Sequence, residues 1–313
     1  MKTYNVVSVS GGKDSAATLL RAIEQNTPNL VAVFADTGNE HPLTYEYVEY
    51  MTQTLGVEIR RVKADFADRF AQRRDYLRSE RAVREWPEEA RLRAIELMTP
   101  TGNPFLDICL LKGIFPSRKT QFCTEELKRN PIHVQVLEPL LDGGKNRVVS
   151  WQGIRADESR NRRDKPEWEL DLGDPDSGAG LWIHRPIIRW TAERVFTYLA
   201  EKGLKPNPLY LQGMGRVGCM PCINARKGEL REIANRFPAE IEWIAEWERL
   251  VSRVAKHSKA TWFSNPGVDL DDISLEEHGI HAHVDWSRTV RGGSQYDLFQ
   301  ETPACSSAYG LCE

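Results

Sequence analysis

The chain has 313 residues, a formal net charge of −3 and six cysteines. Its length is sufficient to bury a substantial core, as one large domain or as one domain with an appendage. The near balance of charge excludes a global basic field of the kind that attracts nucleic acid. No apolar run is long enough to span a bilayer and no signal-peptide pattern is present, so we expect a cytoplasmic protein with no membrane partner.

The N-terminal segment is organised around a glycine-containing turn between a predicted strand and a predicted helix. An apolar run over residues 4–9 precedes the turn, and a helical pattern over 16–23 follows it. This order directs free backbone N–H groups and the positive end of a helix towards a phosphate. Lys13 adds a cation there, and Asp14 is a candidate ligand of Mg²⁺. The turn consists of Ser10, Gly11, Gly12, Lys13, Asp14 and Ser15.

The first half of the chain alternates strands and helices. A second apolar strand over 30–35 ends in Asp36, Thr37 and Gly38, a helix is expected over 42–55, and a third strand over 57–62. This order predicts an α/β fold with a doubly wound, mostly parallel sheet and helices on both faces. Ligands of such sheets lie at the carboxyl ends of the strands, where both the glycine turn and residues 36–38 are expected.

The charged region near 64–112 is expected to be a helical, solvated insertion. A predicted strand over 147–152 ends at Gly153, and the Asp-, Gly- and Pro-rich stretch over 164–180 is expected to be a loop, followed by a short strand over 182–187. Arginine is suited to bidentate capture of phosphate or sulfate. We expect Arg155 and Arg160 to contact a ligand, and the more distal basic residues Arg162, Arg163 and Lys165 to be surface charge paired with acids.

The character of the sequence changes after residue 205. We therefore expect an adenine-nucleotide-binding α/β domain over 1–205 and a mainly helical, cysteine-bearing region over 206–313. Within this region, Trp243 and Trp247 lie in an amphipathic helical pattern and are expected to pack in the core.

The cysteines predict a thiolate centre. Cys219 and Cys222 form a C-x-x-C within a loop, which favours a metal knuckle over a redox pair. Cys123 is the first candidate for a third ligand, Cys305 and Cys312 compete for the fourth position, and Cys109 is expected to be a core residue. An all-thiolate site fits a [4Fe–4S] cluster or a structural Zn²⁺. Their spacing does not separate these, and we favour the cluster.

Separated blocks of the chain resemble one family. The glycine turn is similar to the pyrophosphate loop of the adenine-nucleotide α-hydrolase-like superfamily. Together with the 36–38, 118–128 and 153–160 segments, it resembles the phosphoadenosine-phosphosulfate reductase-like family over residues 4–225. The cysteines look like those of its iron–sulfur branch, which includes adenylylsulfate reductases and the sulfurtransferases of DNA phosphorothioation.

The resemblance implies that an adenine nucleotide lies at the carboxyl edge of the sheet, and that ATP is cleaved between its α- and β-phosphates. The turn would hold phosphates, Asp36 and its neighbours would lie near the adenosine, and Gly153 and Arg155 would close over the nucleotide. The full set of expected nucleotide-binding residues is Ser10, Gly11, Gly12, Lys13, Asp14, Ser15, Asp36, Thr37, Gly38, Arg118, Lys128, Gly153, Arg155 and Arg160.

Two departures from the reductases favour ATP-driven chemistry. Sulfonucleotide reductases usually carry a degraded loop, whereas this chain keeps Lys13 and Asp14. The reductases also carry a tail cysteine in a Glu-Cys-Gly-x-His context, whereas this chain ends in Gly310-Leu311-Cys312-Glu313.

Our first hypothesis is therefore an iron–sulfur-dependent sulfurtransferase that adenylates a nucleic acid or a metabolite and replaces its oxygen by sulfur. Lys13, Asp14 and a sulfur-carrying Cys312 would be catalytic, with a donor such as a cysteine desulfurase. The alternatives are a sulfonucleotide reductase and a nucleotide- and cluster-binding subunit without turnover. A sulfate-adenylating subunit of ATP sulfurylase would share the loop but leave the cysteines without a role.

Overall fold

The computed structural model describes residues 1–290, which form two compact units. The first unit comprises Met1–Ala64 and Thr124–Cys219, and the second comprises Asp65–Cys123 and residues 220–290. Each unit takes segments from both sides of the expected boundary after residue 205, and the domain division itself stays a prediction. Among the described residues, no helix combines the length and apolarity that a bilayer crossing needs.

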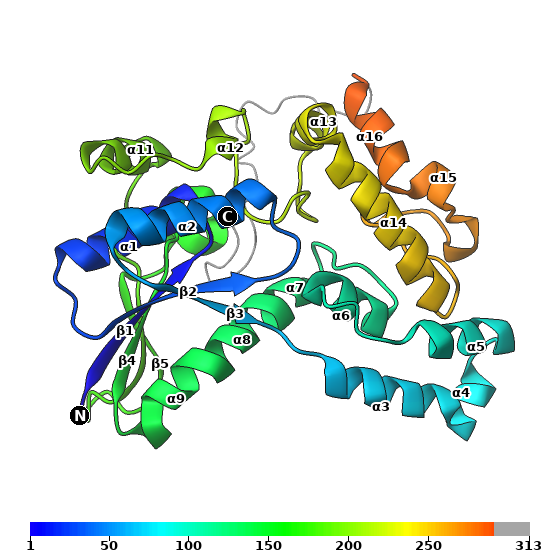
Figure 1. Cartoon of the computed structure of the whole chain (residues 1–313), viewed down its shortest axis with the longest axis horizontal. Coiled ribbons are helices and arrows are strands. Elements are labelled where there is room, and N and C mark those ends of the chain that lie inside the picture. Colours follow the sequence, from blue (N-terminus) through cyan, green and yellow to red (C-terminus); the bar gives the residue numbers. More distant parts are fainter. Residues whose placement is uncertain (291–313) are drawn as a thin grey trace. The chain divides into compact units, whose positions relative to one another are not determined.

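A six-stranded sheet forms the centre of the first unit (Figure 1). Its spatial order is β3-β2-β1-β4-β6-β5, and all neighbouring pairs are parallel except β5 and β6. The predicted doubly wound, mostly parallel sheet is thus confirmed. The strands are β1 (Thr3–Val9), β2 (Leu30–Asp36), β3 (Ile59–Lys63), β4 (Arg147–Trp151), β5 (Trp168–Leu172) and β6 (Gly180–His184).

Helices cover both faces of this sheet because successive strand residues point to opposite sides. Val7 and Val9 of β1 pack with α1 (Lys13–Glu24), α2 (Pro42–Leu55) and α11 (Ala192–Glu201). Val6 of β1 and Val148 of β4 pack with the helical segment 130–141 on the other face. Helix α7 (Phe122–Thr124) crosses the boundary between the two units at residue 124. The remaining helices of the first unit are η1 (Glu125–Arg129), α8 (Asn130–Ile132), η2 (His133–Leu137), α9 (Glu138–Leu141), η3 (Asp142–Gly144), η4 (Ala156–Glu158), α10 (Arg160–Arg163) and α12 (Pro208–Leu211).

The stretch 164–180 differs from its expected loop. It contains β5, which pairs antiparallel with β6 at the edge of the sheet. An edge strand needs no apolar pattern on both faces, so its polar composition concealed it. Trp168 anchors it by stacking on His184 with a ring-centroid distance of 3.9 Å.

The second unit is helical, and aromatic rings fill its core. Phe105 stacks on Trp247 and on Trp262, at ring-centroid distances of 5.7 and 5.1 Å. Trp247 is buried as predicted, but the prediction for Trp243 is wrong, since 59% of that residue is exposed. The helices are α3 (Ala67–Arg78), α4 (Glu80–Glu85), α5 (Glu88–Leu97), α6 (Pro104–Lys112), α13 (Lys227–Arg236), α14 (Pro238–Val254), η5 (Leu270–Asp272), α15 (Leu275–His278) and α16 (Ile280–Arg288).

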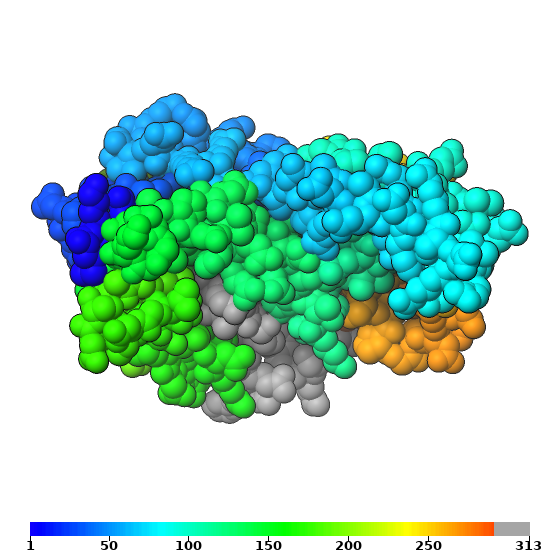
Figure 2. Space-filling model, turned by 90° about the horizontal axis from the view of Figure 1, so that it is seen from below, coloured from blue at the N-terminus to red at the C-terminus, as the bar shows by residue number. Residues whose placement is uncertain are grey.

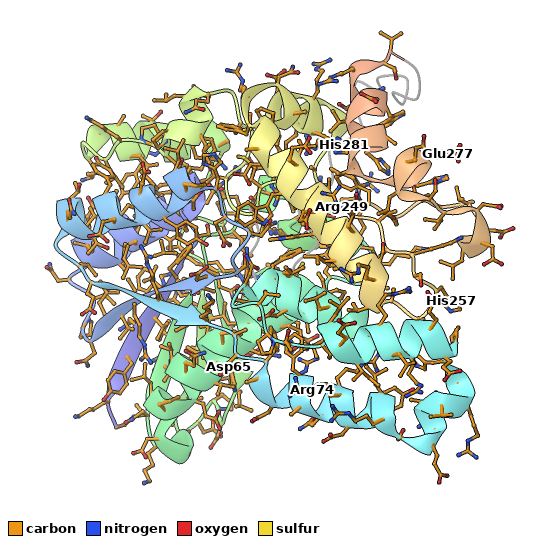
Figure 3. The ribbon with its side chains drawn as sticks, turned by 45° about the vertical axis from the view of Figure 1, so that its right-hand side comes forward. Asp65, Arg74, Arg249, His257, Glu277 and His281 are labelled. Carbon is orange, nitrogen blue, oxygen red and sulfur yellow. The ribbon has the colours of Figure 1, made fainter. Side chains whose placement is uncertain are left out.

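Figure 3 shows the side chains of this unit, among them the charged Arg74 and Arg249. Arg74 of α3 donates to the carbonyl oxygen of Met98, and Arg249 of α14 pairs with Glu246 one turn away. The helical character expected for the charged region 64–112 is therefore observed in α3 to α6.

Candidate functional site: the glycine turn and its ion-pair network

The turn after β1 has the backbone shape that its glycines predict. Gly11 has a φ of +80°, and a Cβ there would lie 2.6 Å from the Thr44 methyl group. Helix α1 starts at Lys13, so the N–H groups of its first turn lie at the glycine turn. The Ser15 hydroxyl accepts from the backbone N–H of Ser10 at 3.1 Å and donates to the carbonyl of Gly12 at 3.0 Å. These contacts fix the turn before any ligand binds.

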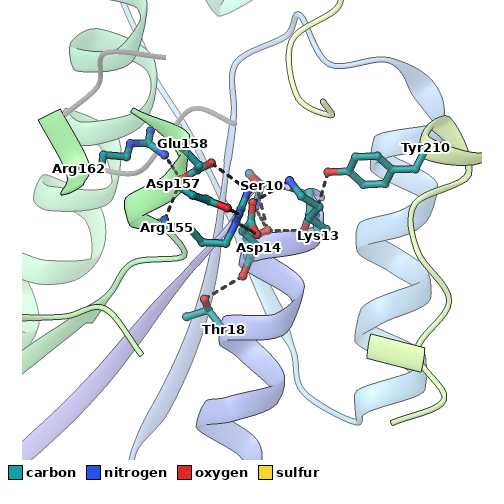
Figure 4. Close-up of polar contacts among 11 residues, drawn as sticks. Ser10, Lys13, Asp14, Thr18, Arg155, Asp157, Glu158, Arg162 and Tyr210 are labelled. Carbon is teal, nitrogen blue, oxygen red and sulfur yellow. Dashed lines mark hydrogen bonds and ion pairs between the residues drawn. The ribbon is translucent and has the colours of Figure 1, made fainter. Parts of the chain in front are cut away.

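Asp14 lies at the centre of a buried ion-pair network (Figure 4). Its side chain is fully buried; Oδ2 lies 2.8 Å from Lys13 Nζ, and Oδ1 lies 2.7 Å from Arg155 Nε. The structure thus joins three of the expected site residues, although 141 positions separate Asp14 from Arg155.

Arg155 connects this centre to the loop after β4. Its guanidinium also pairs with Asp157, and its backbone N–H donates to Glu158 Oε2 at 2.8 Å. Burial lowers the pKa of Arg155, but the carboxylates of Asp14, Glu158 and Asp157 outweigh burial and raise it overall. Arg162 pairs with Glu158, as expected for a structural charge, but it is buried and not on the surface.

Gly153 allows the loop after β4 to approach α1. A Cβ at this position would lie 2.8 Å from the carbonyl oxygen of Asp14 and 2.9 Å from the Thr18 hydroxyl. That hydroxyl donates to the same carbonyl at 2.9 Å. Only a glycine permits this contact, which is what brings Arg155 within reach of Asp14.

Two residues of the turn's environment were not anticipated. The backbone N–H of Lys13 donates to the Tyr210 hydroxyl at 3.0 Å, and the Asn207 side chain donates to the carbonyl of Gly11 at 3.1 Å. Asn207 is the N-cap of α12, and Tyr210 lies within that helix. The sequence signal at this point is a helix cap, Asn207 before Pro208. It predicts that a helix starts here, but not that this helix contacts the glycine turn.

The turn after β2 forms a second polar cluster. Asp36 Oδ1 accepts from the Gly38 N–H at 3.0 Å and from the Tyr45 hydroxyl at 2.7 Å. The buried Glu40 carboxylate accepts from the Thr37 hydroxyl at 2.7 Å. Burial raises the pKa of Glu40, while positive Lys128 and the Thr37 hydrogen bonds oppose that rise. Lys128 therefore acts electrostatically on this turn, and Glu40 is a residue that sequence reasoning missed.

The cysteines divide between the two units. Cys219 ends the first unit and forms a backbone bridge with Glu40; its Sγ lies 3.7 Å from Thr37 Oγ1 and 3.9 Å from Glu40 Oε1. Cys123 and Cys222 belong to the second unit, where Cys222 Sγ accepts from the Asn224 N–H at 3.4 Å.

Cys109 is fully buried, as expected, and its pKa is raised by burial and, to a lesser degree, by neighbouring Cys123. Cys305 and Cys312 lie outside the described residues. Within residues 1–290, no group of three or more His, Cys, Asp or Glu side chains is arranged to hold a metal ion. Thiol donors and an N–H···S bond are chemically suited to an iron–sulfur cluster, and the ligand set stays a prediction.

Two arginines that the sequence predicts to bind nucleotide, Arg118 and Arg160, are not part of the ion-pair network of Asp14 in the described structure. Arg160 is exposed at the first residue of α10, and no contact joins it to the glycine turn among the described residues. Arg118 belongs to the second unit. The roles of both stay predictions.

Comparisons with known proteins identify the family. The phosphoadenosine phosphosulfate reductase domain matches residues 4–225. A 37.8 kDa protein of Escherichia phage 186, described as uncharacterised, is 45% identical over 99% of this chain and 97% of its own length. An adenosine 5′-phosphosulfate reductase of Rhizobium tropici is 32% identical over 33% of this chain and 55% of its own length.

Among solved structures, the phosphoadenylyl-sulfate reductase of Candida auris is 17% identical, with a TM-score of 0.40, and the match covers 70% of this chain and 81% of that one. The domain match extends over more than two thirds of the sequence and includes the glycine turn, the 36–38 turn and the loop after β4. The chain therefore belongs to the phosphoadenosine phosphosulfate reductase-like family, a family of nucleotide-binding proteins of sulfur metabolism.

Proposed function

We propose that the chain is an ATP-pyrophosphatase-type sulfurtransferase, which adenylates an acceptor and replaces the activated oxygen by sulfur. The observation that carries the proposal is the buried Asp14 carboxylate between Lys13 and Arg155, at the first turn of α1. A carboxylate with two cations beside an N-terminal helix end suits a phosphate chain that brings its own Mg²⁺.

Each group has a role in the first half-reaction. The N–H groups of the turn would bind the β- and γ-phosphates, and Lys13 would stabilise the charge that develops on the departing pyrophosphate. An oxygen of the acceptor attacks the α-phosphorus, the bond to the β-phosphate oxygen breaks, and pyrophosphate leaves with the bonding electrons. Asp14 would offer an oxygen to Mg²⁺, and Arg155 would then be released towards the nucleotide.

In the second half-reaction, sulfide attacks the adenylated centre and AMP leaves with the electron pair, so no net oxidation or reduction occurs. The sulfur would come from a donor such as a cysteine desulfurase and would be carried as a persulfide on Cys312. A thiol reductant would supply two electrons, leave as a disulfide and release the outer sulfur as sulfide. Cys123, Cys219, Cys222 and Cys305 would hold an iron–sulfur cluster. An iron of that cluster would bind sulfide only where Cys305 leaves its coordination position open.

The test is release of pyrophosphate from ATP and Mg²⁺. We expect Lys13→Ala to reduce the rate at least 100-fold, whereas Lys145→Ala, with its side chain 77% exposed, serves as the matched control at wild-type rate. Pyrophosphate release by Lys13→Ala at the rate of the control would contradict the proposal.

The named relatives favour a second candidate, reduction of a sulfonucleotide. In this reaction, adenylylsulfate accepts two electrons from a thiol reductant and releases sulfite and AMP, with no requirement for ATP. Sulfite produced from adenylylsulfate in the absence of ATP would select this candidate. Nucleotide binding without either product would favour a binding subunit that has no turnover.

A further inference from the structure

The first unit contains a cavity of about 300 Å³ that the proposed chemistry does not use. It lies on the face of the sheet that α8 and α9 cover (Figure 1). In Figure 2, this helical segment is seen in green, with its outer side at the surface. The residues that line the cavity include Ser8, Asn130, His133, Ser150, Gln152 and Ile183.

Polar side chains interrupt an otherwise apolar face of the sheet at this cavity. Val6 and Val148 are fully buried on the same face, as expected for parallel strands between two helical layers. Further along the same strands, the inward positions are Ser8 and Ser150. Across the described part of the chain, neither serine hydroxyl has a hydrogen-bond partner. Ser150 is level with Val6 in the register of β1 and β4, so Ser8 lies two positions further along on the same face. Two such hydroxyls on neighbouring strands indicate a ligand-binding wall more than a packed core.

A buried arginine fixes the orientation of a third polar group, Gln152. Arg185, which is 1% exposed, donates from Nε to Gln152 Oε1 at 3.3 Å and from Nη2 to Glu169 at 2.6 Å. Because arginine can only donate, the oxygen of the Gln152 amide faces Arg185. The amide nitrogen is therefore the group that Gln152 presents to the cavity, as a donor.

The covering helix departs from α-helical geometry on both sides of the cavity. Its segments η1 and η2 are π-helical, and a proline follows each of them after one intervening residue, at Pro131 and Pro139. A proline lacks an N–H and its ring clashes with the carbonyl four residues earlier, so the helix widens before it. This widening displaces Asn130 and His133 relative to a regular helix, and both line the cavity.

The balance of charge selects the class of ligand. Arg129 at the cavity is already paired with Glu125 at 2.5 Å, and Asp171 in the cavity lining adds a negative charge. A polyanion such as a triphosphate would thus gain little here. Hydroxyl and amide groups above an apolar wall suit a small, neutral, planar ring with hydrogen-bonding edges, and the volume is at the lower end of ligand pockets, roughly 300–1,000 Å³.

We propose that this cavity binds the base of a nucleoside, as a site separate from the phosphate-binding turn. The identification of that nucleoside as part of the acceptor rests on the proposed sulfurtransferase function, whereas the binding itself does not.

The experiment is calorimetric titration of the full chain with adenosine, guanosine, cytidine and uridine, each with and without saturating ATP. We expect at least one nucleoside to bind without competition from ATP. Ser150→Leu, which fills the cavity, should weaken that binding at least 10-fold, and Ser150→Ala should weaken it about 3-fold. Gln53→Leu, on the exposed side of α2, is the control variant and should bind as the wild type does.

Binding of ATP to Ser150→Leu, unchanged within twofold, verifies that this variant folds. Lys13→Ala should show the reverse pattern, with nucleoside binding retained and ATP binding lost, so failure of the ATP proposal is distinguishable from failure of this one. Absence of binding by all four nucleosides, competition by ATP, or wild-type affinity in Ser150→Leu would each overturn the proposal.

Discussion

Two buried carboxylates, one in each unit, differ in the partners that compensate the loss of hydration. Asp14 in the first unit has two cations within 2.8 Å, from Lys13 and Arg155. Within residues 1–290, Glu248 in the second unit accepts hydrogen bonds from backbone N–H groups alone, of Trp262 at 2.6 Å and Ile280 at 2.9 Å. Burial raises the pKa of Glu248 to about 7, because no neighbouring side chain compensates its charge in full.

The difference separates the proposed phosphate-binding site from a structural anchor. Glu248 of α14 holds the first residue of α16 and the loop at Trp262, because both of its donors are backbone N–H groups of these segments. Asp14 and its cations lie at the N-terminal end of α1, where we propose that a metal ion or phosphate exchanges for one of the partners. A carboxylate with two cationic partners is suited to a site that exchanges one partner for a charged ligand. A carboxylate that accepts from two backbone N–H groups is suited to holding two segments of the chain together.

Asp14→Ala should have the largest effect, because it removes the common partner of Lys13 and Arg155. Leaving buried cations without their carboxylate costs about 3–5 kcal/mol. Hydrogen–deuterium exchange of α1 measures this loss in the first unit alone. The control is Asp157→Ala, at a side chain 46% exposed, which should cost below about 1 kcal/mol. Equal losses in both variants would show that the network has no centre at Asp14.

The pH dependence of the second unit should be large as well. The pKa of Glu248 in the folded chain is above its ordinary value of 4.5, so the folded state binds more protons between pH 4.5 and 7. Stability conferred at low pH is therefore lost as pH rises through this window, by up to about 3 kcal/mol. Exchange rates of α14 measured from pH 4.5 to 7.5, after correction for intrinsic rates, test this.

Glu248→Gln is the comparison variant for that measurement, because it keeps a carbonyl acceptor and cannot ionise. Its stability should be level over the same window. A slope in Glu248→Gln equal to that of the wild type would assign the pH dependence to another group.

Gly153→Ala should destabilise the first unit by about 1–3 kcal/mol, since the added Cβ would lie 2.8 Å from the Asp14 carbonyl oxygen. It should also weaken nucleotide binding by displacing Arg155. Gly215→Ala is the matched control, because no atom lies within 4 Å of its added Cβ. Urea unfolding and ATP titration of both variants decide the matter; similar behaviour of the two would contradict close packing at Gly153.

Tyr210→Phe should have the smallest effect. It removes the acceptor of the Lys13 N–H, which costs about 1 kcal/mol in the ligand-free chain. Because that N–H then becomes available to a phosphate oxygen, we expect ATP to bind up to about fivefold more tightly. Calorimetry of ATP binding checks the sign, and weaker binding would instead assign the Tyr210 hydroxyl a direct contact with the nucleotide.

Local pattern predicted much of the first unit. Apolar runs ending in a glycine turn located β1 and α1, and the expected helix over 42–55 coincides with α2. The family resemblance placed Asp14 and Arg155 at the same edge of the sheet, but their ion pair was not predicted and is a finding of the structure. The edge strand β5 was missed because an exposed strand carries little apolar signal, and Trp243 was misplaced because an amphipathic pattern does not say how wide the buried stripe is.

The sequence by itself predicted the glycine turn after β1, a mostly parallel α/β sheet and the family, because each depends on short motifs and apolar runs whose residues are neighbours along the chain. Only the tertiary structure decided that Tyr210 and Asn207 support that turn from almost 200 residues away. It also showed that Glu40 is buried beside Cys219, and that Ser8 and Ser150 face a cavity. These contacts depend on how strands and helices pack, and a linear pattern holds no record of which distant side chains that packing brings together.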